Sequence, residues 1–155
     1  MNPSAPCFLL VDDHALFRTG LGMMLAEHWP EAVMRHAGDW AQALSSARAL
    51  RPAPDLVLLD IQLPDGHGLD NLAQLQALLP DCPVLLMSAQ VDAERLAQAQ
   101  QRGAAGLMAK VASAREIVTA VRAALSGTPT FAMASPLPRP EPIRVLRGGA
   151  FTDES

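Results

Sequence analysis

Five short apolar runs, each opening the chain or following a stretch of helical spacing, constrain the fold of this sequence most strongly. The runs cover residues 7–11, 33–36, 55–59, 84–88 and 106–109. Between them apolar residues return at helical intervals, and the last such stretch aligns Ile117, Val118, Val121, Ala124 and Leu125 on one helix face. Strands that alternate with helices form a parallel sheet covered on both faces. The sequence therefore predicts a three-layer α/β sandwich.

The runs CFLLV and LVLL contain no polar residue, so we expect both faces of these two strands to be buried in the middle of the sheet. Ligands of such sheets bind at the carboxyl ends of the strands. The 155 residues, half of them apolar, suffice for one core, and we predict one domain over residues 1–127. From residue 128 the chain is rich in proline, which predicts a linker or a disordered tail over residues 128–155.

The charge and the apolar pattern exclude several functional classes. Twelve Lys and Arg against sixteen Asp and Glu, a net charge of -4, argue against a nucleic-acid-binding surface. No apolar run is long enough to span a bilayer, and the first residues lack the features of a secretory leader. We therefore expect a cytoplasmic protein without membrane contact. Cys7 and Cys82 have no metal-ligand spacing and are interpreted as buried, reduced thiols.

Acidic residues follow two of the apolar runs. Asp12 and Asp13 come after the first run and Asp60 after the third, and these strands are expected to be neighbours in a right-handed alternating fold. Two carboxylates about 4 Å apart repel by on the order of 4 kcal/mol at an effective dielectric constant of about 20, so a cluster of three favours a divalent cation. Mg²⁺ fits oxygen ligands of this kind. Taken alone, the acid pair could equally cap a helix.

Two further strand ends favour a functional site. Ser88 closes the fourth run and Lys110 follows the fifth. A lysine and a hydroxyl beside carboxylates and a metal ion supply the charge neutralisation and oxygen contacts that a transferred phosphoryl group requires.

This ordered set, with DIQLPDGHG after Asp60 and GAAGLMAK before Lys110, closely resembles the receiver domains of bacterial response regulators. The resemblance implies a flavodoxin-like (βα)5 fold with strand order 2-1-3-4-5. The segment VDDHALFRTGL is most similar to the NarL/FixJ-type subfamily, whose receivers usually precede a LuxR-type helix-turn-helix domain.

The resemblance also implies roles for individual residues. Asp60 would accept the phosphoryl group from a sensor histidine kinase, Asp13 would bind Mg²⁺ directly, and Asp12 would act mainly through a metal-bound water. The backbone carbonyl of Gln62 would be the third protein ligand. Ser88 and Lys110 would contact the phosphoryl oxygens, and a homodimer is an expected partner state.

Three residues are given no such role. Leu107 stands where many receivers have an aromatic switch residue, so a ring movement is not available here. His14 is a poor partner for Mg²⁺ and is interpreted as a residue of the helix start or the site rim. Trp40 begins the second helix, and its side chain could be exposed there.

Alternative functions remain. A phosphatase of the haloacid dehalogenase kind would separate its first two acids by one residue, whereas Asp12 and Asp13 are adjacent. A degenerate receiver acting as a phosphate-independent binding module would be expected to have lost part of the acid and lysine set. The stretch LPRPEPIRVLRGG faintly resembles the entry to a LuxR-type domain, so the chain is either a receiver fragment of such a transcription factor or a receiver without output domain, and DNA binding would need a domain absent from it.

Overall fold

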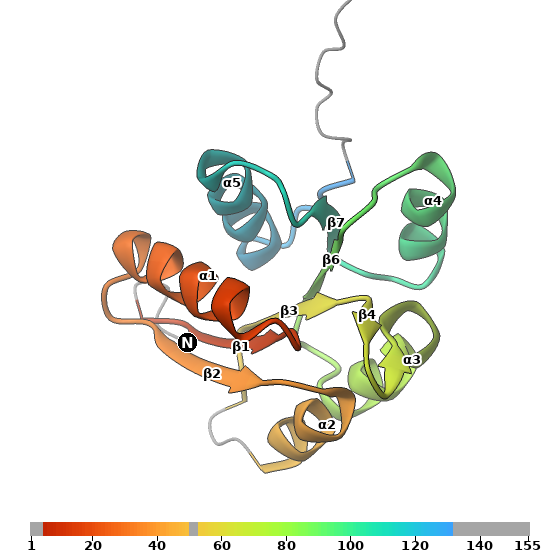
Figure 1. Cartoon of the computed structure of the whole chain (residues 1–155), viewed down its shortest axis with the longest axis horizontal. Coiled ribbons are helices and arrows are strands. Elements are labelled where there is room, and N and C mark those ends of the chain that lie inside the picture. The colour runs from red at the N-terminus through yellow and green to blue at the C-terminus, as the bar shows by residue number, and fades with distance from the viewer. Residues whose placement is uncertain (1–4, 50–52, 132–155) are drawn as a thin grey trace, which may run out of the picture.

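The computed structural model describes residues 5–49 and 53–131, which form a five-stranded parallel sheet between two layers of helices (Figure 1). The strands are β1 (Cys7–Val11), β2 (Val33–Ala37), β3 (Leu56–Asp60), β6 (Val84–Ser88) and β7 (Gly106–Ala109). They lie in the order β2-β1-β3-β6-β7. This is the predicted 2-1-3-4-5 order, and the flavodoxin-like fold is confirmed.

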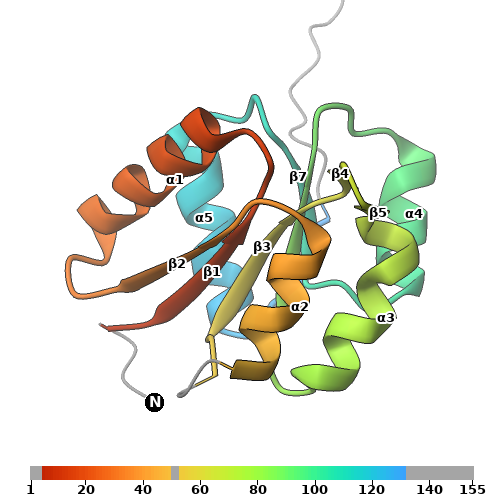
Figure 2. The same cartoon turned by 60° about the horizontal axis from the view of Figure 1, so that its bottom comes forward.

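Helices cover both faces of the sheet. Figures 1 and 2 show α1 (Ala15–His28) and α5 (Ala114–Leu125) on one face, and α2 (Trp40–Ala49), α3 (Gly68–Leu78) and α4 (Ala93–Gln101) on the other. Alternate residues of β1 point to the two layers, with Phe8 and Leu10 in the core under α1 and α5 and Leu9 and Val11 in the core under the other helices. None of the helices in the described segments combines the length and apolarity that crossing a bilayer would require.

The central strands are buried as predicted. Every residue of β1, β3 and β6 is buried, whereas β2, at the edge of the sheet, leaves most of its residues exposed. Full burial of a leucine side chain contributes roughly 1.5–3 kcal/mol, so these three strands supply much of the folding free energy.

The structure shifts two strand boundaries and adds a hairpin. β3 begins at Leu56, not at residue 55, and Asp55 just before it is bound to Cys7, whose backbone N–H donates to the Asp55 carboxylate at 2.7 Å. β3 thus includes Asp60 as its last residue, and β2 continues to Ala37. A two-stranded antiparallel sheet of β4 (Gln62–Leu63) and β5 (Gly66–His67) was not predicted, since two-residue strands have no periodicity to detect.

The expectation that Trp40 could be exposed is wrong. Its side chain is 6% exposed and belongs to the core, and its indole N–H donates to Gln74 Oε1 at 3.2 Å. The predicted burial of the thiols is right for Cys7, while Cys82 is half-buried and precedes β6. Both cysteines are free.

After α5 the chain turns back onto the free edge of β7. Gly127 takes the left-handed conformation, with a φ of 85°, and makes this reversal possible. Thr130 then pairs with β7, donating its N–H to Ala105 at 2.9 Å and accepting from Leu107 at 3.2 Å. A Cβ on Gly106 would lie 2.7 Å from the Thr130 carbonyl oxygen, so this approach needs the glycine. The predicted tail lies, from residue 132 onward, outside the described residues.

Candidate functional site

The predicted site residues meet at one edge of the sheet. Asp12 and Asp13 follow β1, Asp60 ends β3, Ser88 ends β6 and Lys110 follows β7. Because these strands are parallel and consecutive in the sheet, their carboxyl ends lie side by side. A pocket of about 310 Å³ opens there, and it is lined by Asp13, His14, Asp60, Gln62, Leu63, Pro64, Ala89 and Lys110. The pocket is therefore assembled mainly from segments that directly follow the strands.

The acidic side chains form a compact cluster with unequal access to solvent. Asp12, Asp13, His14 and Asp60 each offer one ligand atom within 4.8 Å of the others. The Asp12 and Asp60 side chains are 0% and 4% exposed, whereas that of Asp13 is 36% exposed. Asp13 is thus the most accessible of the three carboxylates.

Lys110 bridges the two buried carboxylates. Its Nζ lies 2.7 Å from Asp12 Oδ2 and 3.1 Å from Asp60 Oδ2, and 4.7 Å from the centroid of the Phe17 ring. Loss of hydration on burial is the largest influence on the Lys110 pKa and lowers it, but the attraction to the Asp12 and Asp60 carboxylates together outweighs it, so the pKa is raised. The ammonium therefore stays charged at neutral pH.

The Asp60 carboxylate is held in a buried position that disfavours its charged form. Its Oδ1 accepts the backbone N–H of Gln62 at 3.0 Å, and its Oδ2 faces Lys110. Burial raises the pKa of Asp60 above its ordinary value, although the Gln62 and Lys110 hydrogen bonds oppose this. A further positive charge in the pocket would relieve the unfavourable burial of this carboxylate.

The donor set fits Mg²⁺. Three carboxylates converge, and Oδ2 of the fully buried Asp12 has the Lys110 ammonium beside it but no hydrogen bond of regular geometry. Hard oxygen donors on a partly open site are what Mg²⁺ takes, with water completing its octahedron. The imidazole of His14 is the poorest donor of the cluster for this ion.

Ser88 is at the predicted strand end, but its hydroxyl points elsewhere. Its Oγ donates to the Gln90 carbonyl at 2.6 Å and accepts the Gln90 N–H at 3.1 Å. Its backbone carbonyl accepts the N–H of Lys110 at 2.9 Å. The serine hydroxyl would have to rotate to face the pocket, while its backbone already connects the ends of β6 and β7.

Two residues near the cluster received no role from the sequence. His14 Nδ1 lies 3.1 Å from Asp12 Oδ1, 3.4 Å from Asp13 Oδ1 and 3.1 Å from Lys110 Nζ. Arg18 donates from Nη1 to the backbone carbonyl of Asp12. The position of His14 directly after the acid pair could have indicated that it lies near the site. The sequence does not reveal the direction of the Arg18 side chain, one turn into α1.

Comparison with known proteins shows which family the chain resembles over most of its length. Residues 8–122 match the family model described as response regulator receiver domain. The response regulator GacA of Pseudomonas viridiflava is 36% identical over 119 residues, which are 77% of this chain and 55% of GacA. The signal receiver domain of the putative response regulator NarL from Mycobacterium tuberculosis superposes with a TM-score of 0.69 at 33% identity, covering 81% of this chain and 99% of that one.

A structure of a LuxR family DNA-binding response regulator from Silicibacter pomeroyi is also similar, with a TM-score of 0.72 and 29% identity, covering 84% and 98% of the two chains. The chain spans about half the length of the curated relatives it matches, GacA among them.

Proposed function

Since the chain belongs to the response regulator receiver domain family, we propose that it accepts a phosphoryl group on the carboxylate of Asp60. The observation that carries this proposal is the setting of that carboxylate, which is buried on one side and open to a pocket shared with Asp13 and Lys110 on the other. A carboxylate oxygen would attack the phosphorus of a phosphohistidine, and the phosphorus–nitrogen bond would break as the acyl phosphate forms.

Mg²⁺ is the expected cofactor, and its charge would offset that of the carboxylates and of the incoming phosphoryl oxygens. Asp13 and Asp60 would hold it through their carboxylates, Gln62 through its backbone carbonyl, and Asp12 mainly through a bound water. These ligand roles are supported by the convergence of the carboxylates and by the position of Gln62 in the wall of the pocket.

Lys110 and Ser88 would hold the phosphoryl oxygens. Lys110 already directs its ammonium at Asp60, so it needs only a small displacement to follow a group attached there. Ser88 would exchange its bond to the Gln90 carbonyl for a bond to a phosphoryl oxygen. This exchange would move the loop that leads to α4 and so connect the chemistry with a surface.

The role of the chain is therefore that of a switch, and turnover is limited to hydrolysis of its own acyl phosphate. A sensor histidine kinase in the cytoplasm would be the donor, and the modified state would change a protein contact such as homodimerisation. The matched relatives include transcriptional activators, so in a longer protein the output would be DNA binding through a separate domain. A binding module independent of phosphate is the competing function.

Acetyl phosphate with Mg²⁺ tests the proposal. Intact-mass analysis should show one added phosphoryl group on the parent chain and none on Asp60→Asn. Asp81→Asn is the matched control, because Asp81 is an exposed acid that precedes β6, at the opposite edge of the sheet. Undiminished labelling of Asp60→Asn would refute the assignment, and failure of the parent to be labelled would favour the binding module.

A further inference from the structure

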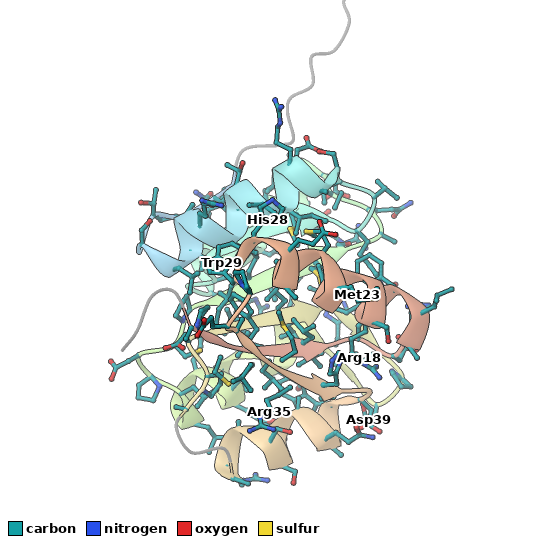
Figure 3. All side chains as sticks on the ribbon, turned by 90° about the vertical axis from the view of Figure 1, so that its left-hand side faces the viewer. Arg18, Met23, His28, Trp29, Arg35 and Asp39 are labelled. Carbon is teal, nitrogen blue, oxygen red and sulfur yellow. The ribbon has the colours of Figure 1, made fainter. Side chains whose placement is uncertain are left out.

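Arg18 connects α1 with the end of β2 and with the backbone of the acid pair. Its Nη1 donates to the backbone carbonyl of Asp12, and its Nε donates to Nδ1 of His36 at 3.2 Å. Figure 3 shows Arg18 between α1 and the edge strand β2, with Arg35 farther along that strand. The guanidinium thus joins three segments of the chain at the rim of the site.

The carbonyl that Arg18 binds belongs to the peptide unit between Asp12 and Asp13. On its other side Asp12 is fixed by its N–H, which donates to the Ala37 carbonyl at 3.0 Å. Because a peptide unit is planar, fixing its carbonyl also fixes the plane that contains the N and Cα of Asp13, and so the point from which the Asp13 side chain starts. The Asp13 carboxylate itself is less constrained, since it lies 3.4 Å from His14 Nδ1 and that ring is 66% exposed.

We propose that Arg18 is a positioning residue for the divalent cation. It holds the peptide unit of the acid pair so that the Asp13 carboxylate faces the pocket, and His36 orients its guanidinium. This inference rests on the magnesium role proposed above and adds a residue that touches no ligand itself.

Arginine suits this role better than lysine. Its guanidinium carries several donors in a rigid plane, so one group can bind the Asp12 carbonyl and the His36 ring together. A lysine ammonium is a point charge on a flexible stem and would not fix the orientation in the same way.

The sign of the effect separates positioning from simple electrostatics. A positive charge near a cation site repels Mg²⁺. If Arg18 acted only through its charge, its removal should therefore tighten Mg²⁺ binding. A positioning residue gives the opposite result, because the ligand it held is no longer in place. Outer-shell partners of metal ligands typically contribute about 10–100-fold in affinity.

Calorimetric titration of the full chain with Mg²⁺, without any phosphoryl donor, tests the inference. Arg18→Met should raise the dissociation constant for Mg²⁺ by about tenfold, and Arg18→Lys should raise it by less. His36→Phe, which removes only the acceptor of Nε, should raise it slightly. In Arg18→Ala, added methylguanidinium should restore part of the affinity, a rescue that a general loss of stability would not show.

Arg35→Met is the matched control, since it removes a positive charge from an exposed position of β2, next to His36. It should leave the dissociation constant for Mg²⁺ unchanged or slightly lower. Mg²⁺ affinity in Arg18→Met equal to or above that of the parent would overturn the positioning role while leaving the proposed function intact. A parent chain that binds no Mg²⁺ would refute the magnesium role, and the inference with it.

Discussion

The Lys110 ammonium lies 2.7 Å from Oδ2 of Asp12, a carboxylate with no solvent exposure. Lys110 follows the edge strand β7, and two strands stand between it and the strand that Asp12 follows. The contact therefore spans the sheet at its carboxyl edge and substitutes in part for the positive charge that a metal ion would add.

Without the Lys110 ammonium, the repulsion among the carboxylates should destabilise the folded protein. Removing one partner of a buried ion pair typically costs about 3–5 kcal/mol, so Lys110→Met should be less stable than the parent in EDTA. Millimolar Mg²⁺ should then stabilise the variant more than it stabilises the parent. Urea denaturation with and without Mg²⁺ measures both effects, with the exposed Arg115→Met as charge control. Equal stability of variant and parent in EDTA would contradict the role of the ion pair.

Asp60→Asn should stabilise the metal-free protein at neutral pH. Burial, the largest cause, raises the pKa of Asp60 in the folded state, so this group favours folding only at low pH and the advantage is lost as the pH rises through that pKa. The neutral variant should therefore gain stability over the parent near pH 7 and lose that gain toward roughly pH 4, where the parent carboxyl is protonated. Urea midpoints across this range test the expectation. A gain independent of pH would point to packing instead.

His36 should make stability fall in mild acid. Burial, followed by the charge of Arg18, lowers the pKa of His36 in the folded state. The unfolded chain then takes up a proton before the folded one, so stability is full above the unfolded pKa of about 6.5 and is lost as the pH falls toward the folded value. His36→Asn should flatten this part of the melting-temperature profile. His28→Asn, an exposed histidine of α1, is the comparison, and an identical slope in His36→Asn and the parent would refute the assignment.

Cys82 should resist alkylation in the native protein. Burial raises the pKa of its thiol to about 12, so almost none of the reactive thiolate is present at neutral pH. Iodoacetamide should modify the folded chain slowly up to about pH 9 and modify both thiols rapidly in urea. Cys82→Ala assigns the signal, because only Cys7 remains in that variant. Rapid native labelling that disappears in Cys82→Ala would contradict the prediction.

Thr130 offers two substitutions with opposite expected effects. Its Oγ1 is buried without a hydrogen-bond partner, so Thr130→Val should raise stability by about 1 kcal/mol. Thr130→Pro removes the N–H that donates to Ala105 and should lower stability by a similar amount or more. Thr128→Val, at an exposed position, should change little. Urea denaturation measures all three, and equal effects of Val and Pro would show that the pairing with β7 does not contribute.

Much of the site could be anticipated because its residues follow strands. The apolar runs predicted the strands of the five-stranded sheet to within one residue, and the parallel order brought Asp12, Asp60 and Lys110 to one edge. The same reasoning could not give the rotamer of Ser88, whose hydroxyl bonds to Gln90, or the burial of Trp40 beneath the hairpin. Those features depend on which atoms lie nearby in space.

The sequence by itself determined the alternation of elements and the acids and lysine at the strand ends, while the strand order was implied by the resemblance to receiver domains. The alternation could be predicted because hydrophobic periodicity acts over a few residues. Only the tertiary structure decided that Lys110 bridges Asp12 and Asp60, that Arg18 binds the carbonyl of Asp12, and that Thr130 pairs with β7. These contacts join segments through side-chain directions and close approaches that no local pattern records, since they depend on how all the layers pack at once.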